Sequence, residues 1–388
     1  MRRERVRIAR YELFAVPPRW LFLRLETEEG LVGWGEPIVE GRARTVAAAV
    51  DELMRKYVLK LDVTRIEDVW QVLYRGGFYR GGPVLMSALA GIDQALWDIK
   101  GKYLGAPVYE LLGGACRDRI RVYRWVGGDE PEEAAEEARA QVARGFTALK
   151  MNVAGRLHPI ESPRGIRRVV ERIARVREAI GEEVDLALDF HGRVSPALAP
   201  RLARALEPYS PLFFEEPVLP PLLERLAQLK TATHVPLAFG ERFYTRWDFQ
   251  PYLEAGVVDV VQPDLSHAGG ITECKKIATL AETYGALAAF HCPLGPIALA
   301  ASLQVATTTH NFLIQETSLG IHYNQGVELT DYLVDPKVFA LEEGFVRIPA
   351  GPGLGIEVDE GAVREAARRW EDWSNPIWRG EDGAVVEW

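Results

Sequence analysis

A strand-like run in the middle of the chain ends on two groups that could do chemistry. The run "LALDFHGRV" (186–194) is apolar up to Asp189 and His191, which one residue separates. Side chains alternate faces along a strand, so we expect both groups to point the same way. An acid after a strand can simply cap a helix, and a lone histidine can be a hydrogen-bonded core residue. Together, the two groups indicate a metal ligand beside a residue that transfers protons.

Two more carboxylates follow at a constant interval. Asp189 and Glu215 lie 26 residues apart, and so do Glu215 and Glu241. An interval of one strand and one helix would place the three carboxylates on neighbouring strands at one level. Packed together, they would repel and raise one another's pKa values unless a cation lay between them. Oxygen-only ligands favour Mg²⁺ before Mn²⁺, and both over zinc, so we predict a Mg²⁺ site at Asp189, Glu215 and Glu241.

The elements that must position these groups recur along the second half of the chain. From about residue 120, strand-like runs alternate with segments whose apolar residues fall at helical spacing. The eight runs are residues 120–126, 146–152, 184–191, 212–217, 236–242, 257–264, 286–293 and 312–316. This alternation is typical of a TIM-type (β/α)8 barrel, in which chemistry takes place at the carboxyl ends of the strands.

The other strand ends also carry polar groups, which are Lys150, Asn152, Asp264, His291 and Glu316. Strands three and seven face each other across a barrel of eight, so His191 and His291 should flank anything held at the metal. Asp264, on the strand beside His291, could hydrogen-bond that imidazole, fix its tautomer and raise its basicity. One histidine could then remove a proton while the other delivers one.

The chain divides into three parts. Residues 1–119 predict an α+β capping domain, in which an antiparallel meander precedes helices. The strands are expected at 4–16, 20–28 and 31–36, and the helices at 43–58, 65–75 and 84–104. Residues 120–334 form the predicted barrel, and the segment 335–388, rich in Gly, Pro and Trp, is expected to pack back on the capping domain.

Composition narrows the class of protein. The chain has 388 residues, is 48% hydrophobic and carries a formal net charge of −9, which argues against a nucleic-acid or anionic-membrane surface. Its three cysteines are too scattered for a disulfide framework or a zinc site, and they favour a cytoplasmic location. Residues 283–315 contain no Asp, Glu, Lys or Arg, but prolines and histidines interrupt them. We therefore expect a buried strand, loop, helix and strand there, and no membrane span.

Longer motifs add a resemblance to a known family. They are "PPRW" (17–20), "VGWGEP" (32–37), "FYRGGP" (78–83), "SALAGIDQALWDIKGK" (87–102), "LDFHGRVS" (188–195), "EEP" (215–217), "QPDLSHAGGITEC" (262–274), "HCPLGPIALAA" (291–301) and "GIHYN" (320–324). On these motifs the chain resembles the enolase superfamily, in its mandelate racemase branch, and within that branch the sugar-acid dehydratases. The resemblance implies an enolase-like fold, bound Mg²⁺ and a homo-oligomer that acts on a small-molecule sugar acid. It implies D-galactonate as the substrate and a 2-keto-3-deoxy sugar acid as the product.

The resemblance also implies a role for each group. The three evenly spaced carboxylates would hold Mg²⁺. His291, paired with Asp264, would remove the C2 proton, and His191 would protonate the departing C3 hydroxyl. Glu316 would hydrogen-bond the substrate carboxylate as it gains enolate charge.

The substrate-binding residues are expected to include Lys150, Asn152, Arg19 and Trp20. Relatives that racemise often carry Lys-x-Lys where this chain has Lys150 and Asn152, and many carry Asn where it has His191. That exchange favours elimination over racemisation. A structural role for Lys150 and a core position for Trp20 are the alternatives.

Three other functions stay open. A dehydratase for another aldonate, such as gluconate or arabinonate, would share every catalytic group. A glycosidase could use the carboxylates of "EEP" but needs a second carboxylate opposite and no metal. A catalytically silent relative, kept for binding, would have lost a metal ligand or a histidine, and this chain retains them all.

Overall fold

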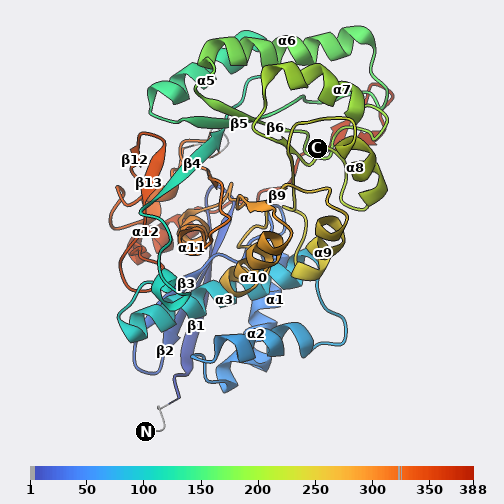
Figure 1. Ribbon diagram of the computed structural model, residues 1–388. Helices are drawn as coiled ribbons and strands as arrows, with labels where there is room; N and C mark the ends of the chain where they lie inside the picture. The colour runs from blue at the N-terminus through green and yellow to red at the C-terminus, as the bar shows by residue number, and fades with distance from the viewer. Residues whose placement is uncertain (1–4, 322–323, 325) are drawn as a thin grey trace.

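The amino-terminal part of the chain is built on a small antiparallel sheet. The computed structural model describes residues 5–321, 324 and 326–388. The sheet contains β1 (Ile8–Val16), β2 (Trp20–Thr27) and β3 (Val32–Gly35), paired in that order. The helices that follow are α1 (Ala43–Lys56), α2 (Ile66–Arg75), α3 (Pro83–Leu104) and the short α4 (Val108–Leu111). The predicted meander and its three helices are confirmed, with ends that differ by a few residues (Figure 1).

Helix α3 joins this sheet to the barrel because it can approach both closely. A Cβ atom on Gly35 of β3 would lie 1.9 Å from the main-chain oxygen of Gly91, so this approach requires glycine. On the other side of α3, Asp93 accepts hydrogen bonds from the main-chain NH and the hydroxyl of Thr272 in α10 (Gly270–Thr283). Most of α3 is consequently buried between the two parts.

In the described part of the chain, eight parallel strands pair in chain order. They are β4 (Arg119–Trp125), β5 (Ala148–Asn152), β6 (Asp185–Asp189), β7 (Phe214–Glu215), β8 (Leu237–Phe239), β9 (Val260–Val261), β10 (Leu287–Ala288) and β11 (Gln315–Thr317). β11 pairs with β4, and Phe312 bridges to Ala288 of β10, which closes the ring. The predicted barrel is confirmed. Its strands end earlier than predicted, so Glu241, Asp264 and His291 lie in the loops just beyond them.

Helices cover the barrel. They are α5 (Pro131–Ala143), α6 (Pro163–Ile180), α7 (Ala199–Leu206), α8 (Leu223–Lys230), α9 (Arg246–Glu254), α10 and α11 (Pro296–Thr307). In α6, the Ser162 side chain accepts the Gly165 NH at the helix start, and buried Val169, Ile173 and Val176 recur at helical spacing.

Helix α11 explains the uncharged stretch of the sequence. Every residue of α11 is buried, because the helix contacts the barrel, α10 and β3 of the capping sheet. The order β10, loop, α11 and β11 confirms the strand, loop, helix and strand expected over 283–315. Within residues 5–321, 324 and 326–388, no helix combines the length and the apolar character needed to cross a bilayer.

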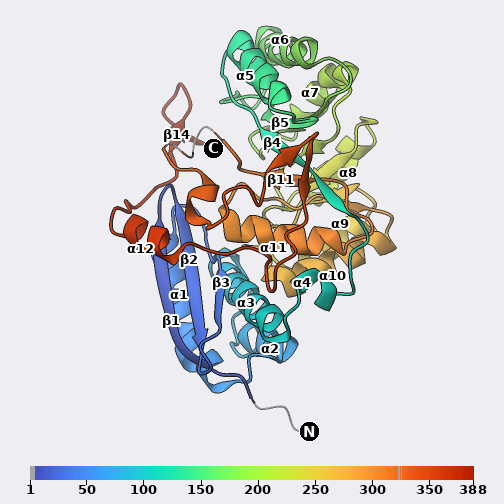
Figure 2. The same ribbon diagram turned by 90° about the vertical axis from the view of Figure 1, so that its left-hand side faces the viewer.

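The segment after the barrel touches both parts. It forms β12 (Leu341–Glu342), β13 (Phe345–Arg347), α12 (Glu360–Ala367), β14 (Trp378–Arg379) and β15 (Val385–Val386). β12 and β13 pair with each other, and β13 adds antiparallel to the start of β4. α12 packs on β1, where Arg364 binds the carboxylate of Glu12. Figure 2 shows the chain continuing from α12, beside the amino-terminal sheet, to the β14 hairpin near the carboxyl end of the chain.

Candidate active site

A cavity of about 850 Å³ lies at the carboxyl ends of the barrel strands. Its lining contains most of the predicted site residues, which are Arg19, Lys150, Asn152, Asp189, His191, Glu241, His291 and Glu316. Glu215 and Asp264 are fully buried beside lining residues. Glu215 is the register partner of Asp189 between β6 and β7, and Asp264 is bonded to His291.

Trp20 does not reach the cavity, which corrects the prediction that it binds substrate. Its side chain is fully buried and packs against Tyr332 and Phe22, with ring centroids 5.8 and 6.3 Å away. Arg19 lies in the turn between β1 and β2 and lines the cavity, whereas Trp20 is the first residue of β2 and lies in the core.

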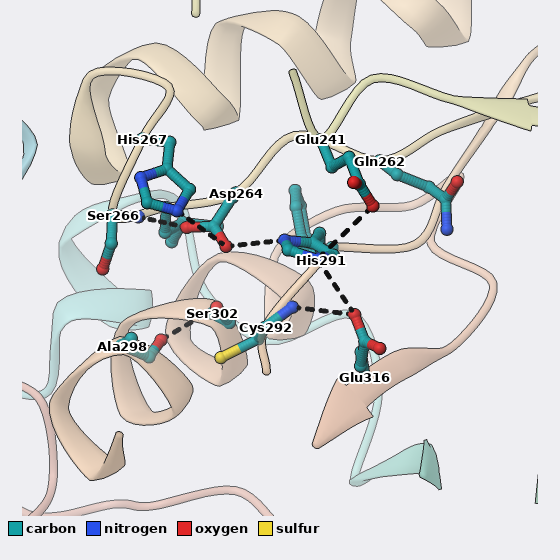
Figure 3. Close-up of polar contacts among 12 residues, drawn as sticks. Glu241, Gln262, Asp264, Ser266, His267, His291, Cys292, Ala298, Ser302 and Glu316 are labelled. Carbon is teal, nitrogen blue, oxygen red and sulfur yellow. Dashed lines mark hydrogen bonds and ion pairs between the residues drawn. The ribbon is translucent and has the colours of Figure 1, made fainter. Parts of the chain in front are cut away.

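His291 is held by one carboxylate and faces two others (Figure 3). Its Nδ1 lies 2.8 Å from Oδ2 of Asp264, whose Oδ1 accepts the main-chain NH of Ser266. Its Nε2 lies 3.5 Å from Glu241 and 3.8 Å from Glu316. Burial alone would lower the pKa of His291, but the three carboxylates outweigh burial and raise it to about 10. Asp264 therefore orients the imidazole so that Nε2 is directed at cavity-lining groups.

His191 is held in a different way. β6 ends at Asp189, and His191 has a φ of 53°, a left-handed conformation that costs a non-glycine residue about 1–3 kcal/mol. Its NH donates to Asp189 at 2.6 Å, and its carbonyl accepts from Arg242 at 2.8 Å. Its Nδ1 lies 2.9 Å from the main-chain oxygen of Trp388, and burial lowers the pKa of the imidazole. Both Asp189 and His191 line the cavity as expected, but a strained turn, not strand alternation, brings His191 there.

The three evenly spaced carboxylates come from neighbouring strands. Asp189 pairs with Glu215 between β6 and β7, and Glu215 pairs with Ala238 between β7 and β8. Glu241 follows three residues after Ala238, beyond the end of β8. Burial raises the pKa of Glu215 to about 8, with help from the neighbouring carboxylates and against the lowering effect of Lys150.

Two residues of β5 hold these carboxylates. The Nζ of buried Lys150 lies 2.6 Å from Glu215 and 2.7 Å from Glu316. Burial would lower the pKa of Lys150, but the two carboxylates raise it well above its usual value, so the side chain is cationic. Asn152 donates from Nδ2 to Asp189 at 3.1 Å. Lys150 and Asn152 thus support the carboxylates, and both also line the cavity.

Oxygen donors suited to a divalent cation are present at this end of the barrel. Asp189 and Glu241 line the cavity, and Glu215 is buried on the strand between them. Among the described residues, no three His, Cys, Asp or Glu side chains converge as a formed cluster, and Glu215 is engaged by Lys150 and Gln262. The donor set fits a hard cation, because all three groups are carboxylates and a cation would offset both the burial and the repulsion that raise the pKa of Glu215.

Sequence reasoning missed several residues of the lining, which include Arg193, Arg242, Tyr244, His267, Trp373, Asn375, Glu387 and Trp388. His267 follows Asp264 by three residues inside the motif "QPDLSHAGGITEC", which could have marked it. The residues after 370 carried no signal except their richness in tryptophan. His322 and Tyr323, from the motif "GIHYN", lie outside the described residues.

Comparisons with known proteins agree with this architecture. Residues 133–362 match a family described as "Enolase C-terminal domain-like", and residues 17–113 match the "Mandelate racemase / muconate lactonizing enzyme, N-terminal domain". A D-galactonate dehydratase from Ralstonia nicotianae is 56% identical over 99% of this chain and 100% of its own length. One from Ralstonia pickettii is 55% identical with the same coverage. The crystal structure of a mandelate racemase/muconate lactonizing enzyme from Sulfitobacter sp. has a TM-score of 0.86 and 33% identity, covering 93% of this chain and 95% of that one.

The chain belongs to the mandelate racemase/muconate lactonizing enzyme family of the enolase superfamily. The family resemblance predicted from the motifs is confirmed, as is the enolase-like fold of capping domain and barrel. Membership of this superfamily implies a divalent metal ion.

Proposed function

We propose that this chain is a D-galactonate dehydratase, a hydro-lyase that removes water across C2 and C3 of the sugar acid. The observation that carries the proposal is the placement of two differently held imidazoles, His291 and His191, on one cavity at the barrel mouth. The full-length relatives with 55–56% identity support the choice of D-galactonate as the substrate.

The reaction needs a base at C2 and an acid at C3. His291 takes the C2 proton through Nε2, while Asp264 holds Nδ1 and stabilises the imidazolium that forms. The bond between C3 and its oxygen breaks, the imidazolium form of His191 gives its Nε2 proton to the departing hydroxyl, and water leaves. The enol that remains loses its hydroxyl proton, takes up a proton at C3 and becomes the 2-keto-3-deoxy acid.

Charge on the substrate carboxylate must be stabilised while the C2 proton leaves. Asp189, Glu215 and Glu241 would hold Mg²⁺, which supplies positive charge to the enolate oxygens when bound. Glu316, fixed by the NH of Cys292 at 3.1 Å, lines the cavity near His291 and would contact the substrate carboxylate.

The direct test is a screen of epimeric aldonic acids with Mg²⁺, in which semicarbazide traps the 2-keto product. We expect turnover of D-galactonate, lost on chelation and in His191→Asn. His310→Asn is the matched control, because His310 is highly exposed and does not line the cavity. Turnover of gluconate or arabinonate in place of D-galactonate would change the proposed substrate, and no reaction with any aldonate would contradict the proposed function.

A further inference from the structure

The last residues of the chain form one wall of the cavity. We call residues 371–388 the C-terminal strap, which follows α12 and contains the β14–β15 hairpin. Trp373, Asn375, Glu387 and Trp388 of the strap line the cavity beside the groups at the strand ends. The strap is therefore a third source of cavity residues, besides the barrel and the amino-terminal domain.

On one side, the strap is fixed to the amino-terminal domain. The guanidinium of Arg19 lies 5.3 Å from the ring centre of Trp373, a distance at which a cation is attracted to an aromatic face. Asn375 packs closely on Gly41, where a Cβ atom would lie 2.1 Å from its Oδ1. Gly41 has a φ of 76°, a conformation that favours glycine, and the Asn375 side chain occupies the space that a Cβ atom would fill.

On the other side, the strap is fixed to the barrel loops. Arg193, in the loop after β6, lies 4.7 Å from the ring centre of Trp378. Arg156, in the loop after β5, lies 5.6 Å from the same ring and donates to the carbonyl of Arg379 at 3.2 Å. The strap thus crosses from the amino-terminal domain to the loops that surround His191.

The strap reaches His191 itself. The main-chain oxygen of Trp388 lies 2.9 Å from Nδ1 of His191, and the two rings meet edge to face at 5.9 Å and 86°. The Trp388 ring also lies 6.2 Å from the ring of Trp373. A main-chain oxygen can only accept, so Nδ1 carries the hydrogen in this contact. The contact therefore fixes both the orientation of the imidazole and the state of one ring nitrogen.

We propose that Trp388 is a positioning residue for the acid step. Its main-chain oxygen holds Nδ1 of His191, so that the other ring nitrogen is directed at the C3 hydroxyl, and its ring closes the cavity together with Trp373. The proposal rests on the proposed function, because His191 acts as an acid only in a dehydration. His291 obtains the same support from Asp264, whereas within the described residues no Asp or Glu side chain lies within hydrogen-bond distance of the His191 ring.

The test separates the two proton transfers. In D2O, exchange of the C2 hydrogen reports His291, and formation of the keto acid also requires His191. Deleting Glu387 and Trp388 is expected to lower kcat for dehydration about 10–100-fold, as loss of a supporting hydrogen bond typically does. The exchange rate is expected to change much less. An equal loss of both rates, or no loss of either, would overturn the positioning role.

Two variants serve as controls. Trp388→Phe keeps both a main-chain oxygen and an aromatic ring, so it is expected to retain most of the parent dehydration rate, unlike the deletion. Val385→Ala alters an exposed side chain of the strap that does not line the cavity, and it is expected to leave both rates unchanged. A dehydration rate in Trp388→Phe as low as that of the deletion would overturn the proposed contact.

A second readout does not depend on turnover. In protein labelled with ¹⁵N-histidine, the Nδ1–H signal that disappears in His191→Asn should be present in the full chain and altered by the deletion. If the signal behaves in this way while no aldonate reacts, the proposed function fails and the acid role fails with it. A signal that the deletion leaves unchanged overturns the strap contact itself, whatever the substrate.

Discussion

The two histidines of the cavity differ in what holds them. His291 is bonded to buried Asp264 and faces two further carboxylates, which raise its pKa to about 10. His191 is bonded through Nδ1 to the main-chain oxygen of Trp388, and burial lowers its pKa. Carboxylates thus favour the charged form of His291, whereas burial outweighs the nearby Asp189 and Glu241 and favours the neutral form of His191.

The charges around His291 do not by themselves give it the protonation state that a base needs. A base must begin without its proton, yet the carboxylates around His291 favour its protonated form. Among the charged groups that raise the pKa of His291, Glu241 has the largest effect. Glu241 is also a proposed ligand of Mg²⁺. A cation bound there would offset that charge and lower the pKa of His291 towards the range of a base.

The largest effect that the comparison predicts comes from removing the base. His291→Asn should lower kcat about 10⁴-fold, the upper end of what general base catalysis contributes. Exchange of the C2 hydrogen should be lost as well, because no other group would take the proton. Dehydration and exchange rates of His291→Asn would be compared with those of the control His310→Asn. Retained exchange in His291→Asn would assign the base to another residue.

Replacing Asp264, the partner of the base, should lower kcat less than replacing His291 does. Asp264→Asn keeps the shape of the side chain but loses the charge that orients His291, so kcat should fall about 10–100-fold. The pKa of His291 should also fall, since Asp264 is one of the groups that raise it. An NMR titration of the imidazole and steady-state rates would check both effects, with exposed Asp118→Asn as the control. An unchanged titration would show that Asp264 does not tune this imidazole.

The metal-free protein should lose stability as the pH rises. The folded state raises the pKa of His291 from its usual 6.5 to about 10, so this group stabilises the fold fully below pH 6.5 and loses that contribution towards pH 10. Glu215, raised to about 8, acts in the same direction over a lower range. Melting temperatures measured in a chelator should therefore fall between about pH 6 and pH 10, and His291→Asn should flatten the upper part of that decline. A stability that increased over this range would contradict the charge distribution described for the site.

The smallest effect on catalysis is expected at Trp20. Trp20→Phe shortens a fully buried side chain that packs on Tyr332, so it should lower the free energy of unfolding by about 1–3 kcal/mol. Denaturant unfolding would measure the loss, and KM should stay within about twofold of the parent value. A large increase in KM with unchanged stability would return Trp20 to the substrate-binding residues.

The parts of the site that the sequence predicted are those fixed by regular structure. A repeat of one strand and one helix brings residues at a constant interval to neighbouring strands, so Asp189 and Glu215 could be placed side by side before their register was known. The pairing of Asp264 with His291 follows from the same rule, because their strands are neighbours in the ring.

The remaining parts depend on contacts that no local pattern encodes. Trp388 meets His191 across 197 residues of sequence, and that meeting follows from the packing of α12 on β1 and of the strap on two loops. The motif "PPRW" marked Arg19 and Trp20 together, but a motif does not say which of two neighbours faces a cavity. That choice is made by the core around Trp20, which the sequence alone does not locate.

The most direct test of the central claim follows C2 hydrogen exchange and keto-acid formation together, by NMR in D2O, in His191→Asn. If His291 is the base and His191 the acid, this variant should exchange the C2 hydrogen of D-galactonate while forming almost no product. Loss of exchange together with dehydration, or dehydration at the parent rate, would contradict the division of labour between the two imidazoles.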